Sequence, residues 1–334
     1  MPESPRTRRG GEPVLLADDI RTRLTEIIGP QFPEQFGRLM AAVGEADAEA
    51  EVELITEQAK DVVLPIVSAR TPARLEYNLS RKGVWATEPN RKVMEFRYET
   101  EDIVGSLTVE YSLGELSTHE MELVSWIMGR WHERGPTVEF SLRECAREFG
   151  VTWGGSRARS FTEALHRIDR TRFTGKVWDS ATKKMMTRHF GIFDDVQILE
   201  RKESFEGRSL ESGEGSVKVT LSSFMHEQLR NNQFARLDWG VLRGRLRSSL
   251  GRRLYAFLEG QKGFSNGTVY EITIDDKLAH TLGSRDTNFD RFRARLRKAG
   301  EEVVGAADRY EAIRVRAGQG GRYHYVLRAE RKAS

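Results

Sequence analysis

One arrangement of residues occurs twice in this chain and constrains its fold more than any other feature. In both copies a short strand leads into a short amphipathic helix that ends at a glycine, Gly150 or Gly283. Cys145 and Leu278 stand at the same offset from those glycines, and an arginine-rich helix follows each time after a turn. Glycine readily adopts the left-handed backbone that ends many helices. The repeat therefore predicts two modules of one architecture in series.

The first copy continues with a helix from about 157 to 170 and a hairpin of two strands. The apolar stripe of this helix is Phe161, Leu165 and Ile168. Ser156 precedes the helix and is its expected N-cap. Other expected elements are strands at 75–79, 93–98, 107–111, 136–140, 173–178 and 190–199, a helix from Ser117 or Thr118 to about 131, and a helix at 142–149. A helix, a turn, a second helix and a hairpin in this order are typical of a winged helix.

The second copy lies in a similar series of elements. We expect strands at 217–221, 269–274, 313–316 and 323–327, and helices at 222–229, 242–258, 276–282 and 285–299. The stripe of the last helix, formed by Phe289, Phe292 and Leu296, corresponds to the stripe of the first arginine-rich helix. The chain is thus expected to be α+β, with two tandem winged-helix domains behind a mostly helical N-terminal extension.

These patterns divide the 334 residues into five parts. The expected parts are a disordered basic arm at 1–13, a helical acidic extension at 14–74, a first winged-helix domain at 75–200, a linker at 201–216 and a second winged-helix domain at 217–330. No apolar stretch is long enough for a membrane span, and the N-terminus is too polar for a secretory signal. We therefore expect a cytoplasmic protein associated with the nucleoid or a plasmid.

The charge of the chain is distributed unevenly. The net charge is only +3, but residues 1–110 carry 14 basic and 20 acidic side chains. Residues 141–190 carry 11 basic and 5 acidic side chains, and residues 236–298 carry 14 and 7. Each basic block contains one arginine-rich helix, which is the electrostatic pattern of a nucleic-acid binder. A solvated, salt-bridged surface would give the same numbers, so charge alone leaves both interpretations open.

Several segments resemble plasmid replication initiators of the RepA/TrfA kind. The segments are Leu116–Ile127, Phe140–Ala146, the turn with Gly154 and Gly155 ahead of the first arginine-rich helix, and Arg252–Leu258. The resemblance covers about residues 107–330 and does not extend to residues 1–74. It implies two winged-helix domains that bind repeated sites (iterons) in duplex DNA at an origin, without catalysis or a cofactor. It further implies opening of an adjacent AT-rich stretch, recruitment of the host initiator and the replicative helicase, and a homodimer in equilibrium with a monomer.

The candidate DNA contacts come from the two arginine-rich helices and the two hairpins. In the second module they are Arg285, Asn288, Arg291, Arg293, Arg295, Arg297 and Lys298, with Arg322 near the hairpin. In the first module they are Arg157, Arg159, Ser160 and Arg167 on the helix and Lys183, Lys184 and Arg188 at the hairpin. Arginine binds guanine O6 and N7 with two hydrogen bonds and asparagine reads adenine, whereas the remaining cations neutralise phosphates. For the arginines of the expected long helix, phosphate contacts for some and simple solvation for others are both left open; these arginines are Arg243, Arg245, Arg247, Arg252 and Arg253.

Motifs of the common catalytic classes are missing or incomplete. Gly175-Lys176 lacks the rest of a phosphate-binding loop, and Tyr323-His324-Tyr325 has one of the two histidines of a nicking site. Cys145 falls on the apolar side of a short helix, where packing explains it better than reactivity. We therefore expect no enzyme and no metal. The alternatives are a transcriptional regulator or autorepressor without a replication role, a partitioning protein and, least favoured, a nicking enzyme.

Overall fold

The structure, a computed structural model, describes most of the chain from residue 72 onward. The described ranges are 72–89, 96–102, 105–131, 135–199, 216–261, 269–286, 288–318 and 325–332. The basic arm and the helices expected ahead of residue 72 lie outside them. The described residues belong to one compact unit, Val67–Ser334. No helix within these ranges is long and apolar enough to cross a bilayer.

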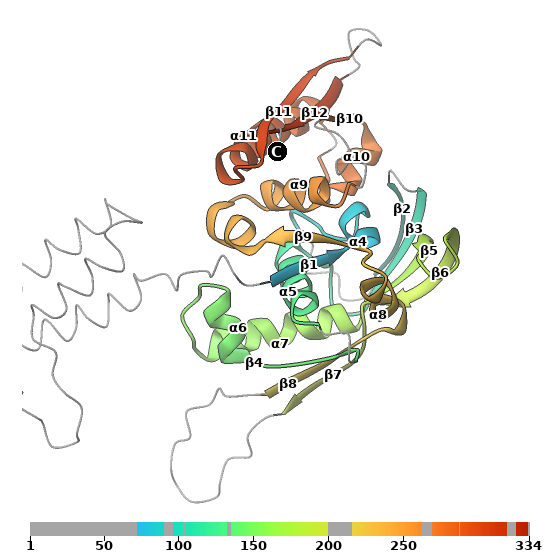
Figure 1. The fold of residues 1–334 in the computed structure, drawn as a ribbon, viewed down its shortest axis with the longest axis vertical. Helices are drawn as coiled ribbons and strands as arrows, with labels where there is room; N and C mark the ends of the chain where they lie inside the picture. The colour runs from blue at the N-terminus through green and yellow to red at the C-terminus, as the bar shows by residue number, and fades with distance from the viewer. Residues whose placement is uncertain are drawn as a thin grey trace, which may run out of the picture. The chain divides into compact units, whose positions relative to one another are not determined.

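The first half alternates short helices with antiparallel strands (Figure 1). Its elements are β1 (Pro72–Glu76), α4 (Tyr77–Arg81), β2 (Phe96–Asp102), β3 (Gly105–Tyr111), α5 (Thr118–Gly129), β4 (Thr137–Ser141), α6 (Leu142–Glu148), α7 (Gly155–Asp169), β5 (Arg172–Asp179), β6 (Lys184–Gly191), β7 (Phe193–Leu199) and β8 (Ser216–Leu221). One sheet has the order β2-β3-β5-β6 and a second has the order β4-β8-β7. The expected strand at 190–199 is therefore two strands, because the chain changes sheet at Ile192.

Helix α5 forms the centre of the first half. Its start is a capping box, in which the Ser117 hydroxyl accepts the His119 N–H and the Glu120 carboxylate accepts the Ser117 N–H at 2.8 Å. Of the two residues that the sequence left open for the start of this helix, Ser117 and Thr118, the structure therefore has Ser117 as the cap. Met121, Trp126 and the other apolar residues of α5 are buried, because β1, α7 and α9 pack around the helix. A helix that is apolar on nearly all sides has to be enclosed in this way.

The second half ends in a sheet that α11 covers on one side. Its elements are α8 (Ser223–Arg230), β9 (Phe234–Asp238), the π-helical segment η1 (Gly240–Arg245), α9 (Ser249–Glu259), β10 (Val269–Thr273), α10 (Asp276–Thr281), α11 (Phe289–Ala306), β11 (Tyr310–Ala317) and β12 (Tyr325–Arg331). The three strands have the order β10-β12-β11. Helix α11 packs against β11 and α9, so α9 connects this sheet with the middle of the molecule (Figure 1).

The internal repeat is present in the backbone. Gly150 and Gly283 have φ angles of +65° and +69°. The N–H of the residue after each glycine donates to the helix, to Ala146 O at 3.0 Å after α6 and to Ala279 O at 2.9 Å after α10. This is the hydrogen bond of a glycine-ended helix. Each of these helices is followed by a turn, a longer helix (α7 or α11) and a pair of antiparallel strands (β5–β6 or β11–β12).

The strand pairing does not follow the expected division at residue 217. Strand β8, expected to open the second domain, pairs with β4 and β7 of the first half. Residues 201–216, expected as a linker, thus join two strands of one sheet. Strand β9 pairs with β1, and these two strands lie between α9 and the first half (Figure 1). The composition of 201–216 carries no information on which strands pair across this segment.

Three local expectations are wrong. Helix α7 begins at Gly155 with Gly154 as its N-cap, so Ser156 is inside the helix and caps nothing. The strand expected at 75–79 ends at Glu76, because the Glu76 carboxylate accepts the Leu79 N–H and caps α4. The long helix expected at 242–258 breaks after η1, since Glu302 accepts the Ser248 N–H at 2.9 Å and Ser248 caps α9.

Candidate nucleic-acid interface

Helix α7 exposes one stripe and buries the opposite one. The buried residues are Phe161, Ala164, Leu165 and Ile168, which confirms the predicted apolar stripe. The exposed side carries Arg157 and Arg159, whereas Ser160 is half-buried. His166 and Arg170 are also exposed and follow Arg159 at helical spacing. Neither residue was among those predicted from the sequence, although their helical spacing was the available signal.

Arg167 lies against the interior rather than on the exposed stripe. Its side chain is 13% exposed, and its Nη2 atom is 2.8 Å from Oε1 of the fully buried Glu120. The Nε atom donates to the same oxygen at 2.9 Å. Glu120 is also the acid of the capping box of α5, so Arg167 neutralises a buried carboxylate. The expectation that Arg167 points outward is wrong.

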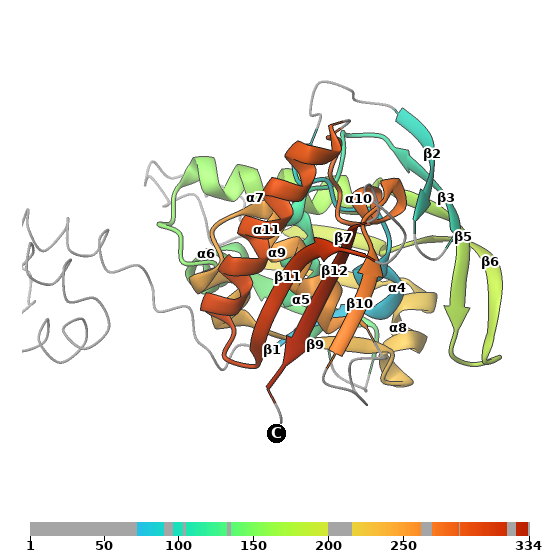
Figure 2. The same cartoon turned by 90° about the horizontal axis from the view of Figure 1, so that it is seen from above.

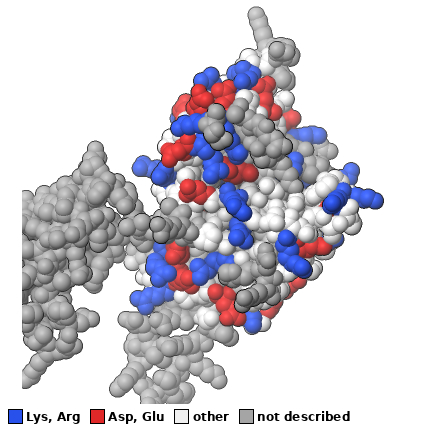
Figure 3. All heavy atoms as spheres, viewed as in Figure 1, with Lys and Arg blue, Asp and Glu red and all other residues white. Residues whose placement is uncertain are grey.

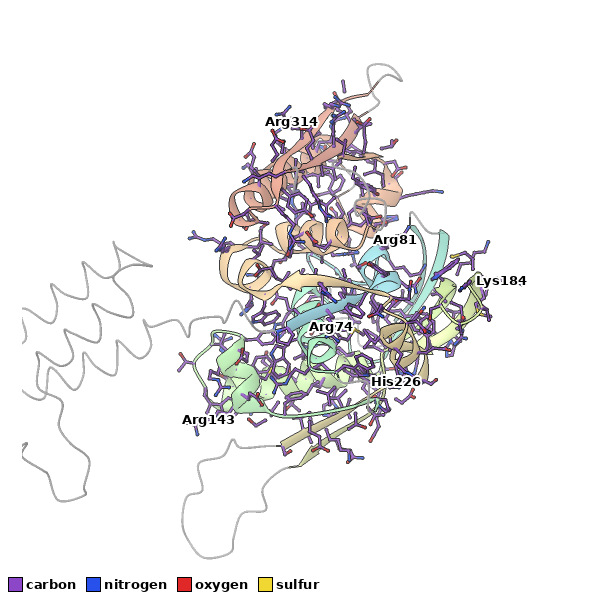
Figure 4. All side chains as sticks on the ribbon, in the orientation of Figure 1. Arg74, Arg81, Arg143, Lys184, His226 and Arg314 are labelled. Atoms are coloured by element: carbon purple, nitrogen blue, oxygen red, sulfur yellow. The ribbon has the colours of Figure 1, made fainter. Side chains whose placement is uncertain are left out.

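In the β5–β6 hairpin, Lys183 and Lys184 at the tip are exposed, whereas Arg188 pairs with a buried carboxylate. Lys183 and Lys184 are exposed, and Figure 4 shows Lys184 at the outer end of the hairpin. The Arg188 guanidinium pairs with the buried Asp179 carboxylate at 2.5 Å and lies over the Phe224 ring at 5.1 Å. A backbone hydrogen bond from Thr182, with the nearby Arg188 charge, lowers the pKa of Asp179. Arg188 therefore stabilises the hairpin, which the sequence analysis did not anticipate.

Helix α11 begins later than expected, and this changes the role of two candidates. Asn288 is the N-cap, and its Oδ1 atom accepts the Arg291 N–H at 3.1 Å. An asparagine that reads adenine needs that oxygen as an acceptor. Arg285 precedes the helix, is half exposed and pairs with the buried carboxylate of Glu115. Arg285 and Asn288 therefore do not share an exposed face of this helix with Arg291 and Arg295.

The exposed stripe of α11 runs through Arg291, Ala294 and Lys298, with Arg297 beside it. The Arg291 side chain is 68% exposed. Among the described residues, neither Arg297 nor Lys298 is in an ion pair. The opposite stripe, with Phe292 and Leu296, is fully buried against α9 and β11, as predicted. The most accessible side of α11 thus carries three cations, Arg291, Arg297 and Lys298, and the small residue Ala294.

The two remaining arginines of α11 lie on its flanks. The Arg293 side chain is 18% exposed, pairs with Asp290 and stacks on the Tyr325 ring at 3.7 Å. Arg295 is 2.7 Å from Asp286 and 2.8 Å from Glu88. These contacts fix the side chains against the protein, which leaves Arg291 as the outward arginine at the start of the helix. Arg322 lies outside the described residues.

Three of the arginines on η1 and α9 connect the two halves instead of facing solvent. Arg253 is fully buried and donates to the carbonyl oxygens of Ser80, Lys82 and Thr281 at 2.7–2.9 Å. Arg243 and Arg252 each lie 3.1 Å from the buried Glu122 carboxylate of α5. Burial raises the pKa of Glu122, and the two guanidinium groups oppose that shift. Of the five long-helix candidates, these three are therefore engaged within the protein, whereas Arg245 and Arg247 are exposed.

Helix α7 and the first turns of α11 lie on one side of the molecule. Figure 2 shows both on the side that faces away from β1 and β9. Figure 3 shows the face viewed in Figure 1, where cations and carboxylates are interspersed.

Cys145 is buried, and burial raises the pKa of its thiol well above the usual range. Within the described ranges, no group of three metal-binding side chains is close enough to hold an ion.

Comparison with known proteins places this geometry in a family. A family model described as replication initiator protein A matches residues 76–302, which includes all of α7 and most of α11. The chain belongs to the replication initiator protein A family. The initiator resemblance identified in the sequence is thereby confirmed. No curated protein sequence matches significantly.

Three solved structures are similar to this replication initiator protein A family member at low sequence identity. A crystal structure of domains 2 and 3 of RctB matches with a TM-score of 0.52 and 14% identity, covering 77% of this chain and 99% of that chain. A second structure of these domains has a TM-score of 0.46 at 12% identity, over 77% and 97% of the two chains. The Pi initiator protein in complex with iteron DNA has a TM-score of 0.43 at 13% identity, over 73% and 100%. Of these three matches, the first has a TM-score above 0.5, and it shows that this chain has the fold of the two RctB domains.

Proposed function

We propose that this family member is an origin-binding replication initiator that recognises repeated sites in duplex DNA. Family membership supports the replication role. The observation that carries the DNA-binding role is the exposed stripe of α11, where Arg291, Ala294 and Lys298 stand opposite a fully buried apolar stripe. A helix with this distribution can enter the major groove without losing its packing against the protein.

Each repeated unit acts, in this proposal, as a winged helix. Helices α7 and α11 enter the major groove, and the helix before each of them crosses the phosphate backbone. The tip of the β5–β6 hairpin brings Lys183 and Lys184 to the phosphates. Two sets of buried contacts keep α7 and α11 in fixed positions relative to each other. They are the ion pairs of Glu122 with its two arginine partners and the hydrogen bonds of Arg253 to its three carbonyl acceptors.

Helix α11 is the principal base reader. Arg291 keeps both terminal nitrogens available for guanine O6 and N7, and Ala294 offers a methyl group to thymine. Arg297 and Lys298 neutralise phosphates. The exposed stripe of α7, with Arg157, Arg159, His166 and Arg170, makes the second set of contacts.

The remaining parts of the proposal concern partners and chemistry. Binding opens an adjacent AT-rich stretch and recruits the host initiator and the replicative helicase, and the protein exchanges between a homodimer and a monomer. It acts in the cytoplasm on plasmid or nucleoid DNA, without a cofactor and without cutting DNA. The raised pKa of the buried Cys145 thiol supports a role of this side chain in packing.

A footprinting experiment on the DNA that flanks the gene tests the proposal. We expect protection of direct repeats about two helical turns apart, next to an AT-rich tract. A plasmid that carries only the gene and these repeats should replicate in a host that lacks another origin. Protection without replication would favour the alternative, a transcriptional regulator. A covalent protein–DNA adduct in the presence of Mg²⁺ would contradict the absence of catalysis.

A further inference from the structure

The outer face of the β5–β6 hairpin carries an exposed aromatic residue beside an exposed methionine. The Trp178 side chain is 37% exposed and the Met185 side chain is 48% exposed, and together with Val269 they are the exposed large apolar residues of the described chain. Trp178 and Met185 are cross-strand partners. Side chains in such a pair have Cβ atoms about 5 Å apart and touch each other. The pair therefore forms one continuous apolar surface.

The hairpin holds this surface away from the rest of its sheet. Strand β3 pairs with β5 only from Arg172 to Gly175, so the part with Trp178 and Met185 extends beyond β3. The backbone of Trp178 is fixed, because its N–H donates to Asn78 Oδ1 at 3.0 Å and its carbonyl oxygen accepts the Asn78 side-chain N–H at 3.3 Å. The opposite face of the hairpin is packed, with Val177 buried and Arg188 over Phe224. The exposed ring thus stands on a rigid support.

Cations surround the apolar pair. Lys176 is exposed on the same face of β5. Lys183 is exposed in the turn, and Lys184, the cross-strand partner of the buried Asp179, is exposed at the tip on the opposite face. The carboxylate of Asp179 is buried and engaged by Arg188, so its charge is neutralised within the hairpin. Between Arg172 and Gly191, Asp179 is the one acidic residue. The face with Trp178 and Met185 therefore combines a stacking surface with the positive charge of Lys176, and the two tip lysines add positive charge at the end of the hairpin.

This combination fits unpaired nucleotides. Bases of a single strand stack on aromatic side chains, and nearby lysines neutralise the strand's phosphates. A base within a duplex has both faces covered by its neighbours and cannot stack on an indole in this way. A protein partner of ordinary composition would not need the three lysines.

We propose that Trp178 and Met185, flanked by Lys176, Lys183 and Lys184, form a binding site for single-stranded DNA. The site is separate from the exposed stripes of α7 and α11, and it rests on the proposed function only in that an opened origin supplies its ligand. The tip lysines contact phosphates in both duplex and single-stranded DNA, whereas Trp178 acts on unpaired bases alone.

The test is binding of the full chain to a labelled oligothymidylate of about 20 nucleotides. We expect Trp178→Ala to weaken this binding by about 5- to 100-fold, the range measured for loss of one base–aromatic stack. Trp178→Phe should restore most of the affinity. Val269→Ala is the matched control, because Val269 is an equally exposed apolar residue on β10, and it should bind as the wild type does. The melting temperature of each variant is measured as a control, and we expect it to equal that of the wild type because the substituted side chains are exposed.

A parallel measurement with duplex DNA that carries the protein's repeats separates this inference from the proposed function. Trp178→Ala should bind that duplex as tightly as the wild type. Equal losses for duplex and single strand would overturn the inference, as would wild-type affinity of Trp178→Ala for the oligothymidylate or the absence of single-strand binding by the wild type. Failure of the wild type to bind its duplex, with a single-strand affinity that depends on Trp178, would contradict the proposed function and leave the inference standing.

Discussion

The carboxylate of Asp286 forms an ion pair with the Nε atom of Arg291. The distance between Asp286 Oδ1 and Arg291 Nε is 3.3 Å, and the other carboxylate oxygen, Oδ2, lies 2.7 Å from Nη1 of Arg295. The Asp286 side chain is 9% exposed, whereas Arg291 is 68% exposed. Within the described chain this ion pair engages only Nε, so both terminal nitrogens of the exposed guanidinium are available to the two acceptors of a guanine edge.

Replacing this carboxylate should reduce sequence discrimination. We expect Asp286→Asn to weaken binding to the preferred site by up to about 10-fold, because Arg291 loses its orientation. Binding to an unrelated duplex should stay the same or become tighter, since one negative charge is removed. Fluorescence anisotropy with both duplexes gives the ratio of the two affinities. An unchanged ratio would show that Asp286 does not position Arg291.

The stability of the protein should depend on the protonation of Glu76. This side chain is fully buried, and burial raises its pKa from 4.5 to about 7 in spite of hydrogen bonds from Asn78 and Leu79. Between about pH 4.5 and pH 7 the unfolded chain loses this proton while the folded chain keeps it. The free energy of unfolding therefore falls as the pH rises through this window, by about 3 kcal/mol in total.

Chemical denaturation of the wild type and of Glu76→Gln across this pH range measures the effect. The glutamine keeps an acceptor for the Leu79 N–H and carries no proton that titrates. We expect the difference in unfolding free energy between the two proteins to change in favour of the variant from pH 4.5 to pH 7, and to level off above. A difference that does not vary with pH would contradict the assigned pKa shift.

The turn between α10 and α11 should not tolerate a side chain at Gly283. Its φ angle is +69°, and an added Cβ would collide with the carbonyl oxygen of Trp85. We expect Gly283→Ala to lower the free energy of unfolding by at least about 2 kcal/mol. Gly155→Ala is the control, since nothing lies near the added Cβ and alanine favours the helix, so it should stabilise by about 0.5–1 kcal/mol. Equal effects in thermal unfolding would be inconsistent with a strained, crowded site at Gly283.

Structural features that depend on residues close together in the chain could be predicted from the sequence. The capping box at Ser117 and Glu120 and the helix ends at Gly150 and Gly283 depend on local hydrogen bonds, and all are present in the structure. The apolar stripes of α7 and α11 were likewise predicted, because helical periodicity determines which residues share a face.

Contacts between distant segments were not readable in this way. The pairing of β8 with β4 and of β9 with β1 joins strands far apart in the chain, and composition gives no register for it. The inward positions of Arg167 and Arg253 and the ion pair of Arg188 have the same origin. Each depends on an acceptor that folding brings to it, such as Glu120 for Arg167. Counting arginines therefore overestimated the number that face solvent.

The central claim is that the exposed stripe of α11 reads bases, and a comparison of Arg291→Ala with Arg236→Ala tests it most directly. Arg236 is an exposed arginine on β9, the strand that faces away from α7 and the start of α11 (Figure 2). We expect Arg291→Ala to weaken binding to the preferred duplex by about 10- to 100-fold and to relax the preference at one base pair, and Arg236→Ala to leave both unchanged. Wild-type affinity and specificity in Arg291→Ala would contradict the claim.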